Sequence, residues 1–63
     1  MKTKFKVFTG KRDSMDRFCL EAVLLARCGG FRTSPKGNGY IAHGDRKLID
    51  ELRDSGYSVV TYD

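Results

Sequence analysis

Hydrophobic and polar residues alternate at the start of the chain, over residues 2–9. One side of this segment consists of Thr3, Phe5, Val7 and Thr9, and the other side consists of Lys2, Lys4, Lys6 and Phe8. A period of two with β-branched and aromatic residues is typical of a strand with one buried face. We therefore expect a strand whose second face is rich in lysine.

Residues 14–28 have the periodicity of a helix instead. Either Asp13 or Ser14 can supply the N-cap, and Gly29 is suited to end the helix. An apolar stripe runs along this helix at helical spacing, and we expect it to face the core. The stripe consists of Met15, Phe18, Cys19, Ala22, Val23 and Ala26.

Leu20 and Leu24 lie off this stripe, beside Arg17 and Arg27. Side chains four residues apart lie one above the other on a helix, so the two leucines form a second apolar patch. Either the helix is covered on two sides, or the pair is exposed and a partner protein buries it. In the second case Leu20 and Leu24 are candidate protein-interface residues.

Glycine and proline divide the rest of the chain into four short elements. We predict strands over residues 31–33 and 40–43, a helix over residues 46–55, and a last strand over residues 57–62. Residues 34–39 between the first two strands have the composition of a turn, which predicts a hairpin. The core face of the second helix consists of Leu48, Ile49 and Leu52.

The predicted order is β-α-β-β-α-β, in one compact domain that covers residues 1–63. With right-handed crossovers this order gives an α+β ferredoxin-like sandwich, a four-stranded antiparallel sheet with two helices on one face. The strands over 2–9 and 40–43 form the central pair, and the second face of the sheet stays open. The alternative is a three-stranded sheet, in which one of the middle strands does not form.

The positive charge of the chain is concentrated at one end. The 63 residues include 12 Lys and Arg and 8 Asp and Glu, a formal net charge of +4. Residues 1–12 contain five of the basic residues and no acidic residue, so the other 51 residues have a net charge of −1. Such segments attract phosphate polymers or acidic protein surfaces. Alternatively, the lysines keep a strand soluble and protect it from pairing with other chains.

In the predicted fold the open face of the sheet combines lysines with Phe8 and Tyr40, while Val7 and Ile41 point to the helices. Aromatic rings among basic side chains can stack bases and neutralise phosphates. We therefore expect a small basic binding module that contacts single-stranded nucleic acid, with Phe8 and Tyr40 stacking on bases. The expected phosphate contacts are Lys2, Lys4, Lys6, Lys11, Arg12 and Lys36.

The segment Lys36-Gly37-Asn38-Gly39-Tyr40-Ile41-Ala42-His43 resembles the RNP1 octamer of RNA-recognition-motif domains. The matching positions are Lys36, Gly37, Gly39, Tyr40 and Ile41. Asn38 stands where the family has a stacking aromatic residue, and His43 stands where Phe or Tyr is usual. Val7-Phe8 takes the place of the family's first-strand aliphatic–aromatic pair, although Lys11-Arg12 do not continue that pattern. The resemblance implies RNA binding on the sheet, with Tyr40 as a stacking residue.

The alternative function is a protein-binding adaptor or inhibitor. Free-standing domains of this size are often made by viruses and mobile elements to bind a host complex, an argument by analogy. The basic first strand could meet an acidic protein surface, or Leu20 and Leu24 could anchor a partner. A homodimer that uses the two leucines is compatible with either function.

Two cysteines and one histidine limit the chemistry of the chain. Cys19 and Cys28 lie about 13 Å apart along the predicted helix, whereas a disulfide needs Cα atoms within about 7 Å. Two cysteines and one histidine are too few for a zinc site, which normally takes four ligands. The spacing of these three residues also predicts no catalytic pair of a nucleophile and a base. We therefore expect Cys19 to be a core residue in a reduced, cytoplasmic, non-enzymatic protein with no metal and no cofactor.

No apolar run approaches the length of about 20 residues that spans a bilayer. The first residues, Met-Lys-Thr-Lys-Phe-Lys, are not followed by an apolar stretch, so they do not read as a secretory signal. We expect no membrane partner.

Overall fold

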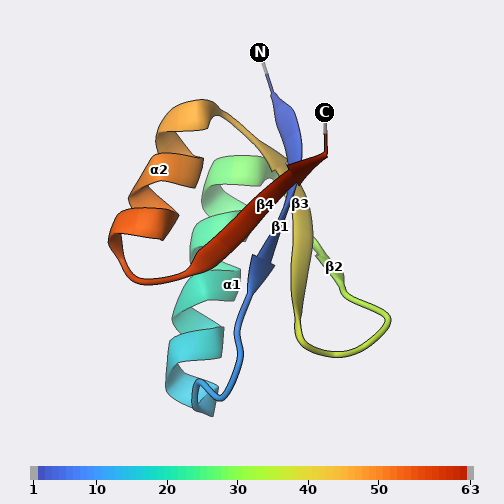
Figure 1. The fold of residues 1–63 in the computed structure, drawn as a ribbon, viewed down its shortest axis with the longest axis vertical. Helices are drawn as coiled ribbons and strands as arrows, with labels where there is room; N and C mark the ends of the chain where they lie inside the picture. Colours follow the sequence, from blue (N-terminus) through green and yellow to red (C-terminus); the bar gives the residue numbers. More distant parts are fainter. Residues whose placement is uncertain (1, 63) are drawn as a thin grey trace.

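A computed structural model describes residues 2–62 of the chain and has an α+β fold with a four-stranded antiparallel sheet and two helices (Figure 1). In chain order the elements are β1 (Thr3–Phe8), α1 (Ser14–Cys28), β2 (Arg32–Thr33), β3 (Gly39–Gly44), α2 (Arg46–Asp54) and β4 (Ser58–Tyr62). The strand order is β2-β3-β1-β4. All four predicted strands form, although β2 has only two residues, and β1 and β3 lie in the centre as expected.

The register of the sheet decides which side chains share a face. Val7 of β1 lies opposite Tyr40 of β3 on one side and opposite Val59 of β4 on the other. Phe5 lies opposite Ala42 in the same way. These side chains are buried, so this face carries the core, and the alternate positions along each strand lie on the second face.

Both helices cover the face of the sheet that carries the core, as Figure 1 shows. The core consists of Phe5, Val7, Leu20, Leu24, Tyr40, Ala42, Leu48, Ile49, Leu52 and Val59. Each helix begins at an aspartate whose carboxylate accepts a hydrogen bond from a backbone N–H of the first turn, Asp13 in α1 and Asp45 in α2. No helix within residues 2–62 is long and apolar enough to cross a membrane.

The prediction for the buried side of α1 is wrong. Leu20 and Leu24 are 3% and 0% exposed and pack in the core, so they are not an exposed pair that awaits a partner. The stripe that we expected to be buried faces solvent, with Phe18 69% exposed. The sequence pattern did not decide which side is buried, because both sides of the helix are apolar. The polar residues beside the leucines have partners at the edge of the core: Glu21 accepts a hydrogen bond from Tyr40, and Arg27 pairs with Glu51 at 3.1 Å.

The predicted facing of β3 is also wrong. Tyr40 is 7% exposed and lies on the side of the helices, while Ile41 and His43 lie on the open side. A shift of one residue transfers every side chain of a strand to the other face. The observed choice buries Tyr40 and Ala42, and it keeps the imidazole of His43 in solvent, where its polar atoms can be hydrated.

Candidate nucleic-acid interface

The sheet surface opposite the helices is the candidate interface, and we call it the open face. Its side chains are Lys4, Lys6 and Phe8 of β1, Arg32 of β2, Ile41 and His43 of β3, and Ser58, Val60 and Tyr62 of β4. Val60 and Tyr62 are each 47% exposed, and Lys4, Arg32 and His43 are also exposed. A broad, solvent-accessible surface therefore remains after the core has formed.

Acidic and basic side chains are separated between the two layers of the fold. Among residues 2–62, every Asp and Glu lies in a helix or at its N-cap, and the four strands carry only the basic residues Lys4, Lys6 and Arg32. The open face therefore has no described carboxylate that would neutralise these cations. A surface of this kind attracts phosphate groups.

Two aromatic rings lie among the cations of the open face. The Lys6 Nζ atom lies 4.6 Å from the centroid of the Phe8 ring, and the Lys4 Nζ atom lies 5.2 Å from that of Tyr62. Tyr62 lies opposite Lys4, four residues from Phe8 along β1. At a rise of about 3.4 Å per residue, the two rings are separated by about 14 Å. They are too far apart to hold one base between them, so each ring can stack on a different base.

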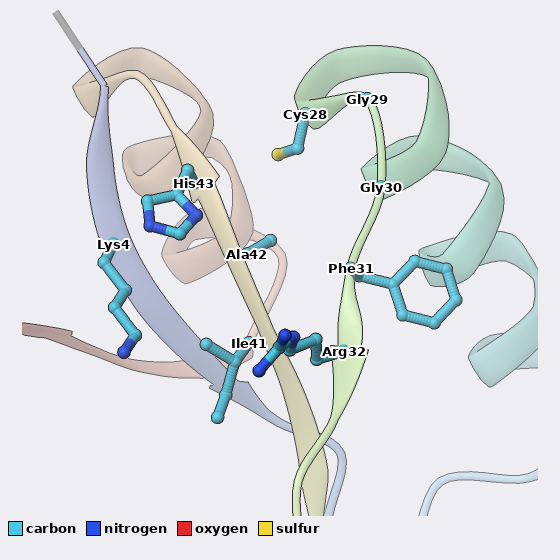
Figure 2. A pocket seen from close by; sticks show the side chains of 9 residues that line it. All are labelled: Lys4, Cys28, Gly29, Gly30, Phe31, Arg32, Ile41, Ala42 and His43. Carbon is cyan, nitrogen blue, oxygen red and sulfur yellow. The ribbon is translucent and has the colours of Figure 1, made fainter.

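A shallow pocket of about 410 Å³ opens where the open face meets the short strand β2. Lys4, Arg32 and His43 line it together with the Gly29-Gly30 segment. Figure 2 shows the side chains of Lys4, His43 and Arg32 around this hollow, while the ring of Phe31 points away toward α1. Two cations and an imidazole around one hollow provide hydrogen-bond donors for an anionic group such as a phosphate.

The other predicted phosphate contacts lie in loops rather than on the sheet. Lys2 is exposed and precedes β1, Lys11 is exposed in the β1–α1 loop, and Lys36 is exposed in the turn between β2 and β3. Arg12 stacks on the Tyr57 ring, with the guanidinium carbon 3.9 Å from the centroid, and its Nη1 atom lies 3.9 Å from Asp16. The structure therefore brings together Lys4, Lys6 and Phe8 of the predicted set.

Tyr40 is not available for stacking, which corrects the sequence-based expectation. Its hydroxyl donates a hydrogen bond to Glu21, and its ring packs edge-on against Phe31 with centroids 5.0 Å apart. The hydrogen bond, with burial as a second cause, raises the pKa of Tyr40 above its ordinary value. The resemblance to the RNP1 octamer implied a stacking ring at Tyr40 on the open face. In this chain Tyr40 lies instead on the side of the sheet that the helices cover.

Sequence reasoning missed Tyr62, Arg32 and His43 as members of the open face. His43 itself was the available signal, because a strand that points this imidazole into the core would bury an unpaired polar group. The correct facing of β3 follows from that choice. Tyr62 then needs only the pairing of β4 with β1, which sets it opposite Lys4.

The two cysteines are free thiols in different environments. Cys19 is exposed, which corrects the expectation that it belongs to the core. Cys28 packs against the core at the end of α1, where burial raises the pKa of its thiol and the nearby charges of Lys2 and Arg27 partly oppose that effect. Within the described part of the chain, no three His, Cys, Asp or Glu side chains are grouped so that they could hold a metal ion.

No protein-family model, curated protein or solved structure matches this chain.

Proposed function

We propose that this protein is a small basic binding module of the cytoplasm that holds single-stranded nucleic acid on the open face of its sheet. The observation that carries the proposal is the separation of charge. The exposed ring of Tyr62 and the half-buried ring of Phe8 lie among the three strand cations, and every described carboxylate lies in the helices or at their N-caps. Rings with cations beside them combine base stacking with phosphate neutralisation.

The two rings of the open face favour a single strand over a duplex, because they can stack only on unpaired bases. Phe8 and Tyr62 can each stack on a base only where that base is unpaired and turned toward the protein. A duplex presents its phosphates instead, and it would leave both rings in solvent. The backbone of the bound strand would pass Lys6 and reach the pocket that Lys4, Arg32 and His43 form, where a phosphate fits the available donors.

We also propose that the fold follows the ferredoxin-like plan. The β-α-β-β-α-β order, the central pair of β1 and β3, and the position of both helices on one face support this assignment. The plan leaves one sheet face uncovered, as the proposed binding mode requires.

The test is to replace the two rings and measure affinity for labelled single-stranded RNA and DNA by fluorescence anisotropy. Each stacked base is worth about 1–3 kcal/mol, so we expect Phe8→Ala with Tyr62→Ala to weaken binding at least tenfold. The pair Phe8→Leu and Tyr62→Leu keeps apolar side chains without a π-face and should lose similar affinity. Unchanged affinity in a folded double variant would contradict the proposal.

A matched pair of charge variants separates the open face from general electrostatics. Lys4→Ala with Lys6→Ala removes two charges from the open face, and Arg46→Ala with Lys47→Ala removes two from α2. Binding on the open face predicts a large loss for the first pair and a small one for the second. Equal losses would show that only the net charge matters.

A protein-binding adaptor remains the alternative function. Its interface cannot be Leu20 and Leu24, because both are buried. The exposed side of α1 is the surface that favours protein contact.

A further inference from the structure

The outward side of α1 is apolar along its whole length, and we call it the outer face of α1. It consists of Met15, Phe18, Cys19, Ala22, Leu25 and Ala26, and all six side chains are exposed. At about 100° per residue these positions fall within an arc of about 120°. Every charged residue of the helix lies outside this arc. The usual pattern of a surface helix, polar outside and apolar inside, is thus absent from α1.

The largest side chains of this face are well exposed. Met15 is 70% exposed, Phe18 69% and Leu25 57%. With the smaller residues they present on the order of 500 Å² of apolar surface, the size of patch that marks an interaction site on a small protein. The whole described surface is 4335 Å², so roughly a tenth of it belongs to this patch, the share that an interface usually takes on a small protein.

We propose that the outer face of α1 binds a second copy of this chain, with the two α1 helices packed antiparallel around a two-fold axis at Ala22. This inference is independent of nucleic-acid binding. Two such patches bury about 1,000 Å² together, which reaches the lower limit of a specific interface. The dimer should therefore dissociate in the micromolar range.

The order of large and small residues along the helix makes the face complementary to itself. The N-terminal half carries the bulky Met15 and Phe18 with the smaller Cys19, and the C-terminal half carries the small Ala26, followed by Gly29, with the bulky Leu25. A two-fold axis at Ala22 sets Phe18 of one copy against Ala26 of the other, and Met15 against Gly29. The same axis sets Leu25 of one copy level with Cys19 of the other. Bulky side chains thus meet small ones, and Ala22 at the axis permits close approach of the helices.

The charges beside the patch are complementary in the same arrangement. Asp16 and Arg27 lie on one flank of α1, six and five residues from Ala22 in opposite directions. Within one copy Asp16 lies 3.9 Å from Arg12 and Arg27 lies 3.1 Å from Glu51. The two-fold axis brings Asp16 of one copy level with Arg27 of the other, which adds a contact between these two ion pairs. A parallel arrangement would instead set like charges level, so charge also favours the antiparallel pair.

The proposed dimer leaves both open faces uncovered. In Figure 1 the helices lie on one side of the sheet, so an axis beyond α1 points the two sheets outward. The N-terminal half of α1 also extends past α2 in that view, and the exposed Met15 and Phe18 belong to this half.

Sedimentation equilibrium in reducing buffer, from 5 to about 500 μM protein, tests the proposal. The monomer has a mass of 7.1 kDa, and we expect a self-limited dimer of twice that mass at high concentration. Phe18→Glu should remain monomeric, and Val60→Glu, the same change at an exposed apolar residue of the sheet, should dimerise normally. A monomer at all concentrations, open-ended aggregation, or a dimer that Phe18→Glu leaves intact would each overturn the proposal.

Cross-linking tests the axis itself. Helix axes about 8–10 Å apart bring facing Cα atoms to about 3.4–5.4 Å, and the upper part of this range suits a disulfide. In a background of Cys19→Ser with Cys28→Ala, we expect Ala22→Cys to form a covalent dimer on oxidation. Arg46→Cys on α2 is the control and should stay monomeric. Equal cross-linking of the two variants would refute the two-fold contact at Ala22.

Discussion

Gly39 offers the sharpest test of the sheet register. It opens β3 opposite Phe8, and its φ is not positive, so its backbone conformation is open to any residue. An added Cβ would overlap the carbonyl oxygen of Val7 and would lie 3.1 Å from the Val7 carbonyl carbon and 3.2 Å from the Phe8 Cα. All three atoms belong to the backbone of a central strand, so no flexible side chain can move aside.

Gly39→Ala therefore has to separate β1 from β3 at this end. The Phe8–Gly39 pairing and the 3.0 Å hydrogen bond from the Thr9 N–H to the Asn38 carbonyl would be distorted or lost. Two or three backbone hydrogen bonds at about 1 kcal/mol each amount to about 2–3 kcal/mol. A core of this size rarely supplies more than about 3–5 kcal/mol of stability, so most of the margin would be lost.

Urea denaturation followed by circular dichroism measures this effect. With a slope of about 1 kcal/mol per molar urea, the midpoint of Gly39→Ala should fall by about 2–3 M. Gly37→Ala is the control, since its φ of 69° costs an alanine conformational energy but no atom lies within 4 Å of the added Cβ. We expect that variant to lose only about 1 kcal/mol. At a slope of about 1 kcal/mol per molar urea, a urea midpoint of Gly39→Ala within about 0.5 M of the wild-type midpoint would refute the register.

Four further outcomes are expected from the charges, the Tyr40 hydrogen bond and the burial of the cysteines. If only the three strand cations contact phosphates, the slope of log affinity against log salt concentration should be about −2, which is a loss of affinity of about 20-fold between 50 and 200 mM salt. If the loop cations Lys2, Lys11, Arg12 and Lys36 also contact phosphates, the slope should be near −5. Tyr40→Phe removes the hydrogen bond to Glu21 and should cost about 1 kcal/mol of unfolding free energy in denaturant titrations. The pKa of Tyr40 is raised in the folded state. The stability that protonated Tyr40 contributes is therefore complete when the pH is below the ordinary tyrosine pKa, and it is lost as the pH rises through the pKa of the folded state. Wild type should thus lose stability above about pH 10 more steeply than Tyr40→Phe, a difference that denaturation at several pH values would reveal. Ellman's reagent should modify the exposed Cys19 before Cys28, because burial raises the pKa of the Cys28 thiol. Mass spectrometry of the first product identifies the modified cysteine, and modification of Cys28 first would contradict the prediction.

The elements of the fold were predictable because local signals agreed. Period two in β1, aspartate N-caps at both helices and glycine at the end of α1 all favour the structures that form. Phe5 and Val7 were assigned correctly to the core, because the lysines of β1 leave only one face that can be buried.

Facing was not predictable where both sides of an element are apolar. In α1 the choice between Phe18 and Leu24 depends on which side fits the sheet, and that fit involves Tyr40 and Ala42, which are distant in sequence. In β3 a preference for burying Ile41 conflicted with the cost of burying His43, and the polar residue decided the outcome. The sequence therefore indicated the lysines and Phe8 of the open face, which belong to β1, but not Tyr62, whose position depends on the pairing of β4 with β1.

The separation of charge between the layers also affects how the molecule meets a partner. The helices with their N-caps carry five basic and seven acidic residues, whereas the strands carry three basic and no acidic ones. The fold is therefore an electric dipole with its positive end at the sheet. The field of an approaching polyanion exerts a torque that turns this end toward it before contact. Encounters are thus pre-oriented, and the open face is the first surface that the polyanion meets.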